Sequence, residues 1–213
     1  MTCSLCESRK AKRSCPALRQ EICPQCCGEA REETLDCPLD CVYLLESRDR
    51  ERRPGLDPAK FPHNEIRITD NFLRENEELL TATARFVLTA AFQTPGAVDR
   101  DVRDALDAMI RTHKTLDSGV YYQTVPQSPL AASIVAGIQQ QLEEFRQQEA
   151  QRTGVTRIRD NDVLGVLVFL LRMALDEDNG RKLCKRFLHT LLLHFQPSAA
   201  PAATTPSPLI VSP

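Results

Sequence analysis

Apolar side chains recur every three or four residues through most of the chain from position 70 to position 195. This spacing is typical of helices that bury one face and expose the other. It predicts five helices, for which we expect the ranges 70–92, 99–117, 128–153, a segment that begins near 160 and includes 163–171, and 181–195. Helices of this kind pack together as a bundle, so the predicted fold class is mainly α.

Residues at the expected helix ends support these ranges. Ser128 and Pro129 form the cap and the first position of a typical helix start. Gly154 follows the third helix, where glycine is the usual terminating residue. We expect Asp160 or Asn161 to cap the fourth helix.

The fourth helix contains nine residues, 163–171, without a polar side chain. This run is too short to cross a membrane and predicts the central buried helix, in which Gly165 allows a neighbouring helix to approach closely. The second helix carries acidic residues that alternate with arginines, which predicts a solvated face and not a metal or acid–base site. These acidic residues are Asp99, Asp101, Asp104 and Asp107.

The first 45 residues contain few large apolar side chains, and a segment this small rarely holds a core unaided. Eight of the nine cysteines lie in this stretch, at Cys3, Cys6, Cys15, Cys23, Cys26, Cys27, Cys37 and Cys41. Four thiolates complete one tetrahedral structural zinc site, so eight cysteines predict two zinc ions. Sites closed by four thiolates leave no position for a substrate, so we expect both ions to be structural.

The adjacent Cys26 and Cys27 indicate how the ligands divide between the ions. Neighbouring side chains point apart, so one ion is not expected to bind both. An interleaved division satisfies this condition, with one site of Cys3, Cys6, Cys23 and Cys26 and a second site of Cys15, Cys27, Cys37 and Cys41. Because Pro38 favours a first helical position, we expect Cys37 at a helix start with Cys41 one turn later.

Two alternatives to zinc use the same cysteines. Eight cysteines are enough for a disulfide framework, and C-x-x-C pairs also occur in redox sites. The first residues lack the apolar stretch of a secretory signal, which favours a reducing compartment and metal binding. We therefore expect a cytoplasmic protein. An iron–sulfur cluster is disfavoured because its ligands are usually spaced differently.

The cysteine pattern resembles known zinc modules. Interleaved pairs of this kind are similar to the cross-brace fingers of the HIT, MYND and B-box families, although this chain lacks their histidine ligands and has two adjacent cysteines. The segments 23–28 and 36–44 also resemble the N-terminus of some uncharacterised bacterial proteins with helical bodies. Because the cross-brace families mostly bind other proteins, the resemblance implies a protein-binding module.

The net charge and the sequence motifs bear on two other kinds of function, nucleic-acid or membrane binding and catalysis. The formal net charge is -2, which gives no global attraction to nucleic acid or to an anionic membrane. A basic run with Arg9, Lys10, Lys12 and Arg13 could contact phosphates. We favour a solvated loop whose cations offset the charge of the zinc thiolates, because no aromatic residues alternate with them to stack bases. Sequence motifs for nucleotide binding, metalloprotease and serine hydrolase chemistry are absent, so no catalytic residue is assigned.

The sequence therefore predicts four parts: a zinc-binding module (1–45), a helical extension and linker (46–63), a helical domain (64–196) and a disordered tail rich in Pro and Ala (197–213). The expected function is that of a non-enzymatic, intracellular adaptor or regulatory protein whose module binds a protein partner. Zinc is the only cofactor expected, and no membrane partner is expected. Binding of nucleic acid through residues 9–13 is the first alternative, and a thiol-redox sensor is the second.

Overall fold

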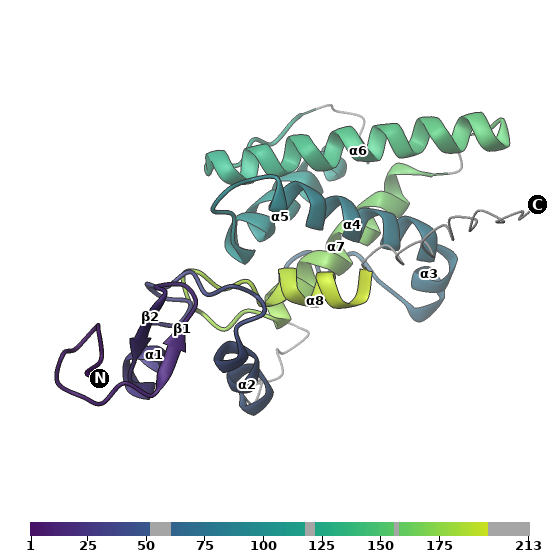
Figure 1. The fold of residues 1–213 in the computed structure, drawn as a ribbon. Coiled ribbons are helices and arrows are strands. Elements are labelled where there is room, and N and C mark those ends of the chain that lie inside the picture. Colours follow the sequence, from purple (N-terminus) through teal and green to yellow (C-terminus); the bar gives the residue numbers. More distant parts are fainter. Residues whose placement is uncertain (52–60, 118–121, 156–157, 196–213) are drawn as a thin grey trace, which may run out of the picture.

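The computed structural model describes residues 1–51, 61–117, 122–155 and 158–195. These residues form eight helices and one two-stranded sheet, so the chain is mainly helical, as predicted. Figure 1 shows a small N-terminal part, which contains the sheet, next to a larger helical body. The predicted tail and residues 52–60 of the predicted linker lie outside the described residues.

The N-terminal part, residues 1–51, is called the cysteine module below. It contains an antiparallel hairpin of β1 (Arg13–Cys15) and β2 (Gln20–Ile22), followed by α1 (Pro24–Ala30) and α2 (Val42–Arg50). Its buried core consists of cysteines and three aliphatic side chains, Ile22, Leu35 and Leu44. Each of these aliphatic side chains contributes about 1.5–3 kcal/mol, so the aliphatic part of this core stabilises the module only weakly.

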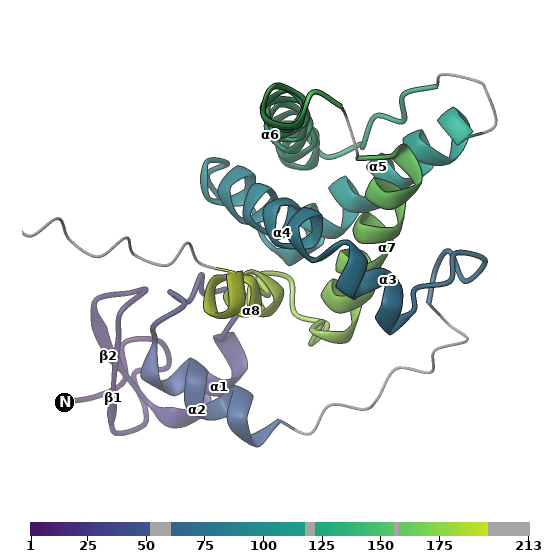
Figure 2. The same ribbon diagram turned by 90° about the vertical axis from the view of Figure 1, so that its right-hand side faces the viewer.

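The helical body contains the other six helices: α3 (Asp70–Glu75), α4 (Glu77–Phe92), α5 (Asp99–Asp117), α6 (Pro129–Thr153), α7 (Asp160–Asp176) and α8 (Arg186–Phe195). α5 packs on α6 and α7, and α4 packs on α6 and α8. The apolar run of α7 is buried, as predicted. Figures 1 and 2 both place α8 next to the cysteine module and α6 on the far side of the body. Among the described helices, none is both long and apolar enough to cross a membrane.

Two of the predicted helix ranges in the body are wrong. The range 70–92 is divided into α3 and α4 at Asn76, whose side-chain amide donates to the carbonyl of Phe72 at 3.0 Å. The backbone N–H of Asn76 donates to the same carbonyl at 3.0 Å, and Asn76 itself leaves the helical conformation, with φ -111° and ψ 23°. The last helix begins at Arg186 and not at position 181. The residues before it form a turn in which the side chain of Asn179 accepts the N–H of Arg181 at 3.0 Å.

Two other predicted helix starts also differ from the structure. Cys37 does not begin a helix, because Cys41 is the N-cap of α2 and the helix starts at Val42. The N-cap of α7 is Arg159, one residue before the earlier of the two predicted positions, and its side chain makes no capping hydrogen bond. Asp160 instead lies in the first turn of α7, where a negative charge interacts favourably with the helix dipole.

Glycines let elements of the body approach closely. A Cβ atom at Gly165 of α7 would lie 2.4 Å from Cζ of Phe72, so the aromatic ring from α3 fills the space that a side chain would need. A Cβ atom at Gly137 of α6 would lie 3.0 Å from Cβ of Ala90 in α4. The close approach predicted at Gly165 is therefore present, and the element that approaches is α3.

A buried carboxylate caps α8 from a distant part of the chain. Asp99 is 1% exposed, and its carboxylate accepts the N–H of Phe187 at 2.8 Å and that of Leu188 at 3.1 Å. Burial raises the pKa of Asp99 to about 6, although these two N–H groups lower it. The solvated face predicted for the acidic residues of α5 is therefore wrong at Asp99, whose buried carboxylate caps the N-terminus of α8.

Glu32 joins the cysteine module to the body. This residue is 2% exposed, and its carboxylate accepts from Nη2 of Arg48 at 2.8 Å within the module and from Nδ2 of Asn179 at 2.9 Å in the body. Its backbone carbonyl accepts the N–H of Leu183 at 2.7 Å. Since a buried ion pair with additional hydrogen bonds is costly to break on one side, Glu32 fixes the module against the body.

Further ion pairs flank Glu32 across the same interface. Nε of Arg186 lies 2.9 Å from Glu177 in the body, and its Nη1 lies 3.0 Å from Glu51 in the module. Nζ of Lys185 lies 2.6 Å from Asp36. The segment before α8 is therefore held along one side of the module.

Candidate metal centre

Cys3 and Cys6 lie in a tight turn at the start of the chain. The N–H of Glu7 donates to the carbonyl of Cys3 at 2.8 Å, and the N–H of Cys3 donates to the carbonyl of Arg9 at 2.8 Å. Glu7 has a φ of 53°, in the left-handed region, and this conformation turns the chain back after Cys6. The turn brings the side chains of Cys3 and Cys6 close together.

Cys23 and Cys26 lie in the first turn of α1. Cys23 is the N-cap, its Sγ accepts the N–H of Cys26 at 3.4 Å, and Pro24 occupies the first helical position. The positive end of the helix dipole favours thiolates at this position. The N–H of Ser4 donates to the carbonyl of Glu21 at 3.1 Å and joins the two cysteine segments.

The sulfur atoms of Cys3, Cys6, Cys23 and Cys26 all lie within 4.8 Å of one another. We call these residues the first cluster. A four-thiolate zinc site with Zn–S bonds of about 2.3 Å has sulfur atoms about 3.8 Å apart. Shifts of about 1 Å or less would therefore bring the sulfur atoms of the first cluster to the spacing of a zinc site. The first cluster is therefore close enough to hold a metal ion, and its soft thiolate donors fit zinc.

Hydrogen bonds determine which thiols of the first cluster lose their protons most easily. The side chain and backbone of Ser8, together with the backbone of Arg9, lower the pKa of Cys6 to about 5. The N–H of Cys26 lowers the pKa of Cys23. At Cys26, the hydrogen bond from Arg9 lowers the pKa, but burial and the neighbouring thiols raise it to about 12. Two of the four thiols thus favour the thiolate form that binds metal.

Cys15, Cys27, Cys37 and Cys41 form a second group. All four are buried, between 6% and 9% exposed, and they line one cavity of about 10 Å³. They come from the end of β1, from α1, from the loop before α2 and from the N-cap of α2. Among the described residues, only the sulfur atoms of the first cluster all lie within 4.8 Å of one another.

The groups that shift the pKa of Cys37 indicate the environment of the second group of cysteines. Burial raises the pKa of Cys37. Negative charge on Cys41, Glu32 and Cys15 raises the pKa of Cys37 further, and the backbone of Glu32 lowers it. Several thiolates in this position would therefore repel one another without a neutralising cation.

Arg9 lies against the sulfur atoms of the first cluster. Its Nε donates to Sγ of Cys23 at 3.3 Å, and its Nη2 donates to Sγ of Cys26 at 3.3 Å. The remaining Nη1 donates to the side chain of Gln25 at 2.7 Å. A planar guanidinium can bridge two acceptors in this way, whereas an ammonium cannot present the same fork. Arg9 therefore places a positive charge against two sulfur atoms of the first cluster.

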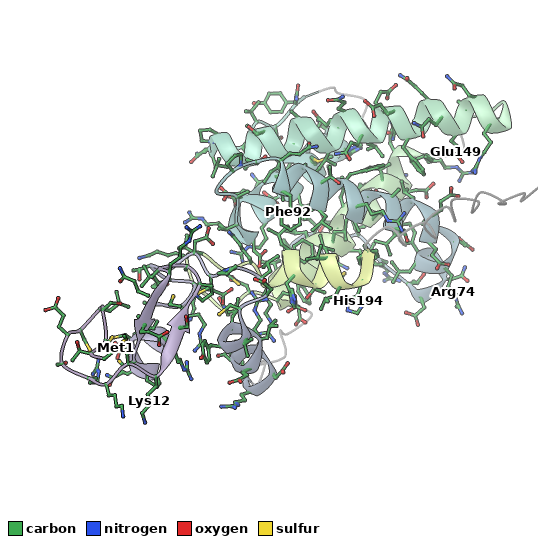
Figure 3. The ribbon with its side chains drawn as sticks, in the orientation of Figure 1. Met1, Lys12, Arg74, Phe92, Glu149 and His194 are labelled. Atoms are coloured by element: carbon green, nitrogen blue, oxygen red, sulfur yellow. The ribbon has the colours of Figure 1, made fainter. Side chains whose placement is uncertain are left out.

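The rest of the basic run divides into two kinds of residue. The guanidinium of Arg13 lies 4.7 Å from the centre of the Tyr43 ring, a cation–π contact within the module. Lys10 and Lys12 are exposed, and Figure 3 shows Lys12 at the end of the module away from the body. Two of the four cations considered for phosphate contact, Arg9 and Arg13, thus have partners inside the module.

Cys184 is the ninth cysteine and lies outside both groups. It is 3% exposed, and burial raises its pKa to about 12. It is therefore an inert thiol of the core. Glu32 and the capping role of Asp99 are not predictable from the sequence, because neither residue belongs to a motif that points to its distant partners.

No protein-family model, curated protein or solved structure matches this chain.

Proposed function

We propose that this chain is a non-enzymatic adaptor or regulatory protein in which two structural zinc ions fold the cysteine module and the module binds a protein partner. The observation that carries the proposal is the first cluster, with four sulfur atoms within 4.8 Å of one another. A structural zinc ion contributes about 10–16 kcal/mol of folding free energy. The three buried aliphatic side chains of the module contribute roughly 5–9 kcal/mol together, so metal binding is the larger stabilising term.

The second zinc ion is proposed for Cys15, Cys27, Cys37 and Cys41. What supports it is that all four thiols are buried around one cavity, where thiolates without a cation would be strongly destabilised. The adjacent Cys26 and Cys27 fall into different groups, which is the interleaved arrangement predicted for two ions. Since each ion would be closed by four thiolates, neither offers a position for a substrate.

A protein partner is favoured over nucleic acid because Arg9 and Arg13 are engaged within the module. This leaves Lys10 and Lys12 as the two cations of the basic run that can contact phosphates. If nucleic acid were the partner, replacing both lysines by Ala would weaken its binding and reduce the salt dependence of that binding. Unchanged binding and salt dependence would remove this alternative.

The test of the metal sites is native mass spectrometry of the full chain purified without chelator. We expect two zinc ions per chain. Cys23→Ser should lower the count to one ion and Cys27→Ser should do the same, because each removes one ligand from a different group. Cys184→Ser is the matched control, since it removes a buried cysteine outside both groups and should keep two ions.

Other results would contradict the proposal. A chain without metal, with a mass lower by the protons lost in disulfides, would show that the cysteines are paired covalently. Alkylation of the cysteines in the metal-loaded protein as fast as in the chelated protein would favour the redox sensor, because redox thiols must be accessible. Cysteines that react only after chelation are expected for structural zinc.

A further inference from the structure

Part of the cysteine module takes no part in the ion pairs that hold the body. The body is held by residues 31–37 and by Glu51, which follows α2: Glu32 accepts a hydrogen bond from Asn179, and Asp36 and Glu51 form ion pairs. Val42, at the start of α2, is 62% exposed, and Pro16, after β1, is also exposed. An exposed aliphatic side chain beside an exposed proline makes this side of the module the available surface for a partner.

A groove of about 540 Å³ lies at this surface. Its apolar lining includes Pro16, Val42 and Tyr43, and two acidic residues, Asp40 and Glu46, also line it. Val42 and Glu46 lie one turn apart on α2 and therefore share a helix face. The groove thus combines an apolar contact area with carboxylates next to it.

The groove has an excess of negative charge. Among the described residues, no Lys or Arg lines the groove, and the guanidinium of Arg13 stacks on the ring of Tyr43. Glu46 has one ion pair, at 3.9 Å from the exposed Arg50, and such exposed pairs contribute about 0–1 kcal/mol. Asp40 forms no ion pair with any residue in the described ranges.

We infer that this groove binds a short extended segment of a protein partner, with a Pro, Val or Leu side chain against Val42 and Tyr43 and a Lys or Arg side chain against Asp40 or Glu46. This inference rests on the proposed function and states the chemistry of its partner. The acidic lining repels the phosphates of nucleic acids and of anionic lipids, which disfavours both as occupants. A groove of this size contacts only a few residues, so the complex is weak and reversible.

The test uses the full-length, zinc-loaded chain. A phage-displayed library of random dodecapeptides is selected against it, and the enriched peptides are labelled and titrated by fluorescence anisotropy. We expect these peptides to share a Lys or Arg beside a Pro, Val or Leu. The double variant Asp40→Lys with Glu46→Lys should raise their Kd at least about tenfold, because attraction is replaced by repulsion. Val42→Ala should raise it about fivefold through lost apolar contact.

The matched control reverses two exposed carboxylates on α6, on the far side of the body, with Glu143→Lys and Glu144→Lys. It makes the same change in net charge and should leave the Kd unchanged. The zinc content of every variant is measured, so that a loss of metal is not mistaken for a loss of binding. An equal effect of the α6 variant would overturn the inference, because it would show that net charge and not the groove governs binding.

Three other outcomes distinguish the proposals. A zinc-loaded chain that enriches no peptide, or only acidic peptides, contradicts the groove and leaves the zinc-folded module intact. A chain that binds no zinc but still enriches basic peptides contradicts the zinc proposal and supports the groove. Self-association, seen by light scattering and lost in the Asp40→Lys, Glu46→Lys variant, would assign the groove to a second copy of this chain and overturn the proposed partner.

Discussion

Replacing Glu32 by Gln removes one charge from the interface between the cysteine module and the body. The carboxylate of Glu32 is bonded to Arg48 at 2.8 Å and to Asn179 at 2.9 Å. Arg48 is 7% exposed, and within the described part of the chain its Nε and Nη1 have no hydrogen-bond partner. Glu32→Gln therefore leaves Arg48 as a buried cation without its bonded anion. Breaking one side of a buried ion pair costs about 3–5 kcal/mol.

The assay is thermal unfolding of the zinc-loaded protein, followed by circular dichroism. For a chain of this size, 1 kcal/mol shifts the Tm by about 2–4 °C, so we expect Glu32→Gln to lower the Tm by roughly 6–20 °C. Glu33→Gln is the matched control in the same loop. Glu33 pairs with Lys182 at 3.0 Å, but the lysine side chain is 76% exposed. Such a pair contributes about 0–1 kcal/mol, so the control should lower the Tm by at most about 4 °C.

A double variant separates the buried charge from the lost hydrogen bonds. Arg48→Met in the Glu32→Gln background removes the buried cation and keeps most of its apolar volume, so it should recover part of the lost stability. Equal effects of Glu32→Gln and Glu33→Gln would refute the reasoning. So would a double variant less stable than Glu32→Gln alone, because Arg48 would then stabilise the fold without its anion.

Two further predictions concern Arg9 and Asp99. Arg9→Ala should weaken zinc binding about 10–100-fold in competition with a chromophoric chelator, because groups that hydrogen-bond to metal ligands tune affinity on this scale. Lys12→Ala, in the same basic run, should leave zinc affinity unchanged. Equal losses of zinc affinity in the two variants would contradict the role of Arg9. Asp99 has its pKa raised from 3.8 to about 6 in the folded state, so the folded protein binds more protons than the unfolded chain between these values. Lowering the pH from about 7.5 to about 5 should therefore stabilise the natural protein by about 1 kcal/mol relative to Asp99→Asn in urea unfolding, and a pH-independent difference would contradict this.

The parts of the fold that the sequence predicts depend on local patterns. The predicted range 99–117 agrees with α5, and 128–153 differs from α6 only by its capping residue. In both helices the apolar period is long and the ends carry typical start or stop residues. The approach of the first four cysteines also follows from local features, since each C-x-x-C pair lies in a single turn.

The remaining features depend on contacts between distant positions. Asp99 caps a helix 88 residues away, and Glu32 bonds to a side chain 147 residues away. Read locally, each is one acidic residue among several, and an acidic residue near arginines predicts a solvated surface. The break at Asn76 is missed because the apolar period continues through this residue, whereas its backbone leaves the helical conformation.

The contacts of Glu32 also connect the second group of cysteines to the body. Glu32 lies in the segment between Cys27 and Cys37, two cysteines of the second group, and its carboxylate accepts a hydrogen bond from Asn179 of the body. On the proposed function, metal binding at Cys37 therefore also orders the residue on which the interface depends. A ligand that binds only the folded state stabilises every part of the protein that unfolds together with its site. Zinc at Cys37 would therefore stabilise the body as well as the module. For this reason the effect of Glu32→Gln should be smaller in chelated protein, where the loop of Glu32 is no longer held at Cys37.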